Sequence, residues 1–290
     1  MASGEVKMEM DSKQLDEWWN KYMKAKLIED AEVEEMLKQF ESHDQLRLKF
    51  AEEFKLIELL SQPVLKISED ALQKDKMHRA DQLYRDWGSV SSKEYLVSYY
   101  NNELFLAVYT KRRFVVSATS FLQALVYRIF PECPEVEPYI TTNVSRVISV
   151  GCGSGADIAA FLAFFHSRSI SRQLVYYAID QSPGWNQYIS ALDKVVSAEY
   201  RTTIWFKNAF FGMNCSDLDM LPEADMVVFS FANTARINPY IWELMQIKYR
   251  LIIVLDGVKE VLKTNFGDVK FKNLRLSSKT TVYFYFRGDS

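Results

Sequence analysis

A short β-branched run that ends in three closely spaced glycines is the feature that most constrains the fold of this chain. Residues 146–150 have the composition of a buried strand, and Gly151, Gly153 and Gly155 follow directly. Glycine adopts left-handed backbone conformations at little steric cost, so the pattern predicts a tight turn after the strand. Apolar residues then recur at helical spacing, which predicts a helix after the turn. The recurring residues are Ile158, Phe161, Leu162 and Phe165.

The chain beyond this turn alternates between strand and helix patterns. Residues 269–276 and 280–286 alternate in side-chain character around a short polar stretch at 277–279, which predicts an antiparallel hairpin. The α/β alternation predicts a doubly wound, mostly parallel, seven-stranded sheet that this C-terminal hairpin closes. The further strands are predicted at 174–179, 203–206, 225–231 and 250–255, and the further helices near 185–196 and 241–247.

The part of the chain before this domain predicts only helices. Apolar stripes at helical spacing run from Leu15 to Ile57, and a further helix is expected to start near Ser68. Three prolines within residues 131–138 interrupt regular structure, so we place a boundary there. The chain is thus divided into an all-helical N-terminal region, 1–138, and a cofactor-binding domain, 139–290. The aromatic helices just before the boundary serve either as core or as a roof over the ligand site, and both interpretations stay open.

Charge and cysteine usage narrow the function classes. Residues 1–70 carry 17 acidic and 10 basic side chains, a net charge of −7, which leaves +4 for the remainder of a chain whose total is −3. Because neither part has the strongly basic composition of nucleic-acid-binding domains, we do not expect a nucleic-acid partner. The three cysteines are isolated, which predicts no metal site and a reducing compartment, cytoplasmic or nuclear. We expect no membrane span, and the acidic helical region is a candidate surface for a protein partner.

Several candidate binding residues follow the predicted strands directly. In a doubly wound sheet the loops at the carboxyl ends of the strands converge where the strand order reverses, and ligands bind there. Asp180 ends the second strand, and its carboxylate can accept two hydrogen bonds from the vicinal hydroxyls of a ribose. We therefore predict that the glycine turn and Asp180 hold a nucleotide-like cofactor.

The run Val147–Gly155, followed one strand later by Ala178-Ile179-Asp180, resembles the class I S-adenosylmethionine-dependent methyltransferases over residues 145–290. The resemblance implies that S-adenosylmethionine is the cofactor. It also implies that the glycine turn holds the methionine part, that Asp180 binds the ribose and that residues 208–210 border the adenine. The cofactor candidates are Gly151, Cys152, Gly153, Ser154, Gly155, Asp180, Gln181, Asn208, Ala209, Phe210 and Ser230, with Tyr99, Tyr100 and Asn233 as substrate or lid candidates. We assign no catalytic residue, since methyl transfer from a sulfonium depends mainly on alignment and exclusion of water.

The chain departs from the family pattern at three places. Ser149 stands where many members carry an acidic residue, two positions before the first glycine, and Gln181 stands where an apolar residue is frequent. Residues 230–233 also lack the Asn/Asp-Pro-Pro-aromatic sequence of enzymes that methylate planar amino groups. The leading interpretation is a methyltransferase for a small-molecule or protein acceptor. The alternatives are a catalytically silent methyltransferase-like scaffold and, third, a nicotinamide-dependent oxidoreductase, because Gly151, Gly153 and Ala156 also fit Gly-x-Gly-x-x-Ala.

Overall fold

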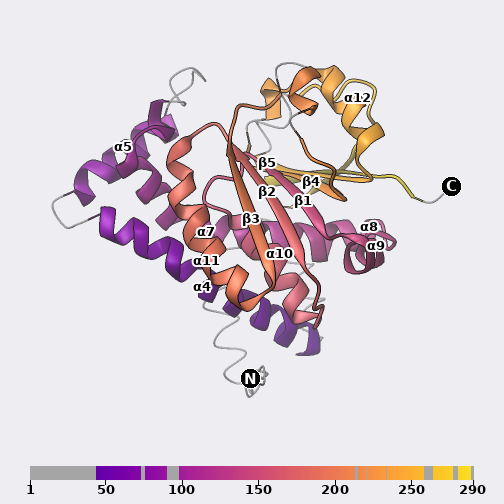
Figure 1. The fold of residues 1–290 in the computed structure, drawn as a ribbon, viewed down its shortest axis with the longest axis horizontal. Coiled ribbons are helices and arrows are strands. Elements are labelled where there is room, and N and C mark those ends of the chain that lie inside the picture. The colour runs from indigo at the N-terminus through magenta and orange to yellow at the C-terminus, as the bar shows by residue number, and fades with distance from the viewer. Residues whose placement is uncertain are drawn as a thin grey trace.

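A seven-stranded sheet in the order β3-β2-β1-β4-β5-β7-β6 forms the centre of the computed structural model (Figure 1). Strands β1 to β5 are parallel, whereas β7 pairs antiparallel with both β5 and β6. The predicted doubly wound sheet and its antiparallel C-terminal strands are therefore confirmed. The strands are β1 (Arg146–Val150), β2 (Leu174–Asp180), β3 (Thr202–Asn208), β4 (Met226–Ser230), β5 (Leu251–Gly257), β6 (Lys272–Arg275) and β7 (Thr280–Phe286).

The structure describes residues 44–72, 76–89, 98–212, 215–219, 221–232, 234–257, 264–276 and 280–288. Three sequence predictions fall outside these ranges: the helices before residue 44, the side chain of Asn233, and the polar turn at 277–279.

Helices cover both faces of the sheet (Figure 1). The long helices α4 (Asp44–Ala71) and α7 (Glu103–Gln123) pack on α10 (Ala156–Ser167), and α4 also packs on α11 (Asn186–Glu199). The opposite face is covered by α12 (Pro239–Lys248). The shorter helical elements are α5 (Met77–Ser89), η2 (Ala124–Ile129, a π-helix), α8 (Phe130–Glu132), α9 (Val136–Asn143), η3 (Pro183–Trp185), η4 (Cys215–Leu218) and η5 (Thr234–Arg236).

Alternation along the central strands divides the core into two layers. In β1, Val147 points into the layer beneath α10, whereas Ile148 and Val150 point into the layer beneath α12. Successive side chains of a strand face opposite sides of its sheet, so a strand covered on both sides is apolar throughout. Ser149 is the exception among the buried residues of β1, because it is polar although it is fully buried on the α10 side.

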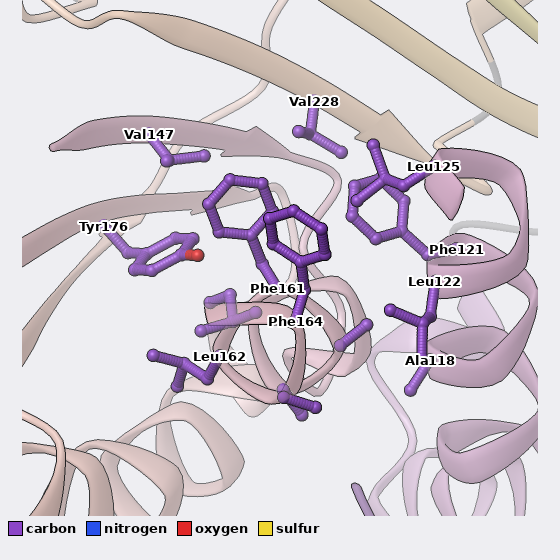
Figure 2. Packing of buried hydrophobic residues seen from close by; sticks show 14 of the residues in the cluster. Ala118, Phe121, Leu122, Leu125, Val147, Phe161, Leu162, Phe164, Tyr176 and Val228 are labelled. Atoms are coloured by element: carbon purple, nitrogen blue, oxygen red, sulfur yellow. The ribbon is translucent and has the colours of Figure 1, made fainter. Parts of the chain in front are cut away.

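Aromatic side chains of α10 fill the layer between the sheet and α7 (Figure 2). Phe161 lies 6.1 Å from Phe164 and meets the ring of Tyr176 on β2 edge-on at 6.2 Å, measured between ring centroids. Phe121 and Leu125 approach the same layer from the helical region (Figure 2). One continuous core thus joins the N-terminal helices to the sheet.

Two local predictions of the helical region need revision. No helix starts near Ser68, because α4 continues through this residue, whose hydroxyl donates to the Val64 carbonyl one turn earlier. In the proline-rich segment, the helical structure is interrupted only over residues 133–135, and α9 already begins at Val136. The boundary at residue 138 stays a prediction.

The continuous helical stretch Glu103–Glu132 is long and apolar enough to cross a membrane by length and composition, which differs from the sequence expectation. Half of its apolar window is buried inside the fold, against α4, α5 and α10. Core helices of globular proteins meet the same criterion, and burial accounts for the apolar composition here.

A buried ion pair joins the helical region to the far end of α10. The Arg168 guanidinium donates to the Glu53 carboxylate of α4 at 2.6 Å and to Glu137 of α9 at 3.0 Å. Its charge also lies 3.7 Å from the centroid of the Phe164 ring. Glu53 is only 2% exposed, so this carboxylate depends on its partner for compensation.

Replacing Arg168 with Met leaves the Glu53 carboxylate buried beside an apolar side chain. We expect the free energy of unfolding to fall by about 3 kcal/mol, measured by urea denaturation. The matched control is Arg112→Met, which breaks the more exposed Arg112–Asp81 pair and should cost less than about 1 kcal/mol. Equal losses in the two variants would contradict a joining role for Arg168.

Candidate functional site

The glycine turn lies where β1 gives way to α10, and its backbone is left-handed at every glycine. The φ angles are +66° at Gly151, +52° at Gly153 and +89° at Gly155. The amide groups of Gly151 and Cys152 both donate to the Ile179 carbonyl, at 2.8 and 3.2 Å. The predicted turn is therefore tied directly to the end of the neighbouring strand β2.

Asp180 at the end of β2 points toward this turn. One carboxylate oxygen accepts the Gly153 amide at 3.0 Å, and the other accepts the Ser182 amide at 2.9 Å. Burial raises the pKa of Asp180 to about 6, against the opposing effect of these two amides and of the Gln181 amide. A carboxylate has about four lone-pair positions, so acceptor capacity remains beyond these amides.

The loop after β3 supports the end of β2. The Asn208 side-chain amide donates to the carbonyl oxygens of Asp180 and Gln181, at 3.1 and 2.9 Å, and the Ala209 amide also donates to Asp180 O at 2.9 Å. Phe210 follows with 39% of its surface exposed. Residues predicted to border an adenine thus lie beside Asp180, with the Asn208 amide nitrogen already bonded to backbone.

The loop after β4 packs against the glycine turn from the other side. A Cβ atom added at Gly151 would lie 2.6 Å from Cβ of Ala232, so only glycine fits this contact. Phe231 has a left-handed φ of +56°, and its amide donates to the Leu255 carbonyl at 2.7 Å. A positive φ is uncommon for an aromatic residue and concentrates at functional sites. Ser230 therefore leads into a strained segment that contacts the turn.

Aromatic side chains of the helical region lie against the loop after β2. The ring centroids of Tyr100 and Tyr109 are 6.3 and 6.0 Å from that of Trp185, whereas Tyr99 packs on Phe105 at 5.4 Å. Burial is the main cause that raises the pKa of Tyr100, with further contributions from the Tyr109 phenol and the Asp180 charge. These aromatic side chains pack in the main core and also border the loop after β2, so both interpretations of the aromatic helices stay open.

The position of Ser182 directly before Pro183 suggests a helix N-cap, but the Ser182 side chain does not cap the following helix η3. Its hydroxyl donates instead to the Tyr100 carbonyl, and no side-chain cap bond forms at the start of η3. The contact links the loop after β2 to the segment before α7, a tertiary interaction that the local pattern does not reveal.

Sequence reasoning did not identify the partner of Ser149. Its hydroxyl donates to the Asp157 carboxylate at 2.6 Å, and both residues are buried. Desolvation raises the pKa of Asp157 to about 6, although the Ser149 hydroxyl acts in the opposite direction. The available signal was a single acidic residue in the apolar run Ala156–Phe165.

A methyl group at Gly151 tests the contact between the turn and the loop after β4. We expect Gly151→Ala to lower the free energy of unfolding by about 3 kcal/mol, because backbone strain adds to the clash with Ala232. Gly153→Ala is the control, since its Cβ would meet no atom within 4 Å, and about 1 kcal/mol of strain should remain. Urea denaturation measures both, and similar losses would contradict the clash.

The buried Asp157 carboxyl predicts a specific pH dependence of stability. Its pKa is higher in the folded than in the unfolded chain, so the folded state binds the proton more tightly. The contribution to stability therefore grows as the pH falls through about 6 toward 4. Relative to Asp157→Asn, the wild type should gain about 2 to 3 kcal/mol between pH 8 and pH 4, measured by urea denaturation. A constant difference would show that the carboxyl titrates normally.

No family model and no curated protein matches this chain. A protein from Listeria monocytogenes described as a class I S-adenosylmethionine-dependent methyltransferase aligns at 10% identity and a TM-score of 0.42, over 81% of this chain and 88% of its own. The Podospora anserina methyltransferase PaMTH1, bound to S-adenosylhomocysteine, aligns at 11% identity and a TM-score of 0.37, over 74% and 97%. The small RNA methyltransferase HEN1 aligns at 13% and 0.37, over 55% of this chain, which spans only 25% of HEN1.

The order and the direction of the strands characterise the sheet directly. The order of the five parallel strands reverses between β1 and β4. The antiparallel strand β7 lies between β5 and the edge strand β6. The glycine turn and Asp180 stand at that reversal. The described sheet thus has the strand order and the antiparallel ending that fit the resemblance of the sequence to the class I S-adenosylmethionine-dependent methyltransferases.

Proposed function

We propose that this protein binds S-adenosylmethionine and transfers its methyl group to a small-molecule or protein acceptor. The observation that carries the proposal is the hydrogen bond between the Gly153 amide and the Asp180 carboxylate. It holds a carboxylate with spare acceptor capacity against a turn of three left-handed glycines, at the reversal point of a doubly wound sheet. A turn and a carboxylate so placed suit the two ends of one adenosyl-containing ligand.

The proposed roles follow the position of each group. The glycine turn would lie along the methionine part, Asp180 would accept the ribose hydroxyls, and Phe210 would border the adenine. When bound, S-adenosylmethionine would supply a sulfonium methyl group that is already activated, so no protein residue would need to activate it. The protein's own contribution is then alignment of the acceptor and exclusion of water, for which the aromatic helices beside Trp185 are suited.

The order of the strands favours this proposal over a nicotinamide-dependent oxidoreductase. A dinucleotide-binding sheet continues with a second set of parallel strands, which binds the second nucleotide half. Here β7 runs antiparallel beside β5, so the described strands beyond β5 do not supply that half. The silent scaffold remains the alternative from a different class, and cofactor binding separates it from the enzyme.

Titration calorimetry with S-adenosylmethionine, S-adenosylhomocysteine and NAD tests the proposal. We expect the first two ligands to bind and NAD not to bind. In Asp180→Asn, the affinity for S-adenosylmethionine should fall by about tenfold or more, because a charged acceptor for the ribose hydroxyls is lost. Binding of NAD alone would replace the proposal with the oxidoreductase, and absence of all binding would leave the scaffold.

Asp225→Asn is the matched control for this titration. The Asp225 carboxylate also accepts two backbone amides, those of Ser145 and Arg146 at 2.8 Å each, but it lies at the amino end of β1. The two variants therefore lose the same charge and comparable structural bonds at opposite edges of the sheet. Equal loss of affinity in both would show a general effect on folding rather than contact with the ligand.

A further inference from the structure

Asp157 is a buried carboxylate directly behind the glycine turn. It lies in the first turn of α10, two residues after Gly155, and it is 4% exposed. Ser149, the residue of β1 that faces α10, donates its hydroxyl to this carboxylate at 2.6 Å. The bond spans the turn from the strand before it to the helix after it, so it fixes the distance between the two ends of the turn.

Among the described residues, the groups that face Asp157 include no compensating cation. Ser149 faces it from β1, the Cys152 thiol from the turn and the Tyr176 phenol from β2. Backbone amides of Asp157 and Ile158 complete the contacts from α10 itself. Within the described part of the chain, no basic side chain forms an ion pair with Asp157.

Hydrogen bonds from Ser149 and two backbone amides offset only part of the cost of burying this carboxylate, because burial still raises its pKa to about 6. A buried ionisable group of this kind beside a ligand site is a candidate for a functional role. Asp180 bonds to the Gly153 amide and Asp157 bonds to Ser149 just before the turn, so two carboxylates lie around the same turn. Burial is the main cause that raises the pKa of the Cys152 thiol, and the charges of Asp180 and Asp157 add to it. S-adenosylmethionine carries one more positive charge than S-adenosylhomocysteine, on its sulfonium. A fixed negative charge behind the turn favours the charged ligand, and low local dielectric strengthens the effect.

We propose that Asp157, held by Ser149, is a positioning and specificity-determining residue that makes the glycine turn prefer S-adenosylmethionine over its demethylated product. The inference rests on the proposed function. Ser149 stands at the position where many members of the resembled family carry an acidic residue. We assign the negative charge near the turn to Asp157 instead. The preference would assist release of the product after each methyl transfer.

The test compares the dissociation constants of the two ligands in wild type, Asp157→Asn, Ser149→Ala and Asp225→Asn. In Asp157→Asn the preference for S-adenosylmethionine should fall by about fivefold or more, mainly through weaker binding of that ligand. Ser149→Ala keeps the carboxylate and should retain the preference, although both affinities fall together. Asp225→Asn removes the same charge elsewhere and should change neither affinity.

A measurement on the wild type makes the test independent of how the variants fold. Binding of the sulfonium ligand should release protons at pH 6 and not at pH 8, because it favours the ionised carboxyls, and calorimetry in two buffers of different ionisation enthalpy measures the release. Asp157→Asn should release fewer protons than wild type, with the remainder from Asp180. An unchanged ligand preference and unchanged proton release in Asp157→Asn would overturn the inference, whereas no binding by wild type would overturn the proposed function instead.

Discussion

The hydrogen bond from the Gly153 amide to the Asp180 carboxylate is the interaction on which the rest of the site depends. It joins the first two strand ends of the sheet, and those ends coincide because β1 and β2 are parallel and in register up to Val150 and Ile179. The loop after β3 then bonds to the backbone of Asp180, and the loop after β4 packs on Gly151. Each of the four loops is therefore positioned relative to one carboxylate and one turn.

The helical region is part of this arrangement rather than an appendage. Leu106 of α7 lies where a side chain at Gly184 would have to be, and Ser182 donates to the Tyr100 carbonyl. The later turns of α7 pack in the core beneath the sheet. This packing fixes the position of the whole helix, including its first turn beside the loop after β2. The loop after β2 is therefore positioned partly by helices that lie outside the sheet domain.

The sequence departures acquire different meanings in three dimensions. Ser149 reads as the loss of an acidic residue, yet its hydroxyl meets the carboxylate of Asp157 eight positions later. Charge is therefore retained near the turn, although it comes from a helix instead of a strand. Gln181, in contrast, is exposed. No described contact of its side chain takes over the packing that an apolar residue would provide at this position. Asn208 lies beside Asp180, and its amide nitrogen bonds to the backbone of Asp180 and Gln181; its role beside an adenine stays a prediction.

Amino-acid order by itself determined the strand and helix alternation, the glycine turn and the candidate role of Asp180, because periodicity and backbone preference are local properties. The alternation over 280–286 also predicts the bounds that β7 has. Only the tertiary structure decided three contacts. The Ser182 hydroxyl donates to the Tyr100 carbonyl, Ala232 packs against Gly151, and the Ser149 hydroxyl donates to Asp157. These contacts join segments whose approach depends on how the sheet and the helices pack, and no spacing along the chain encodes which side chains then meet.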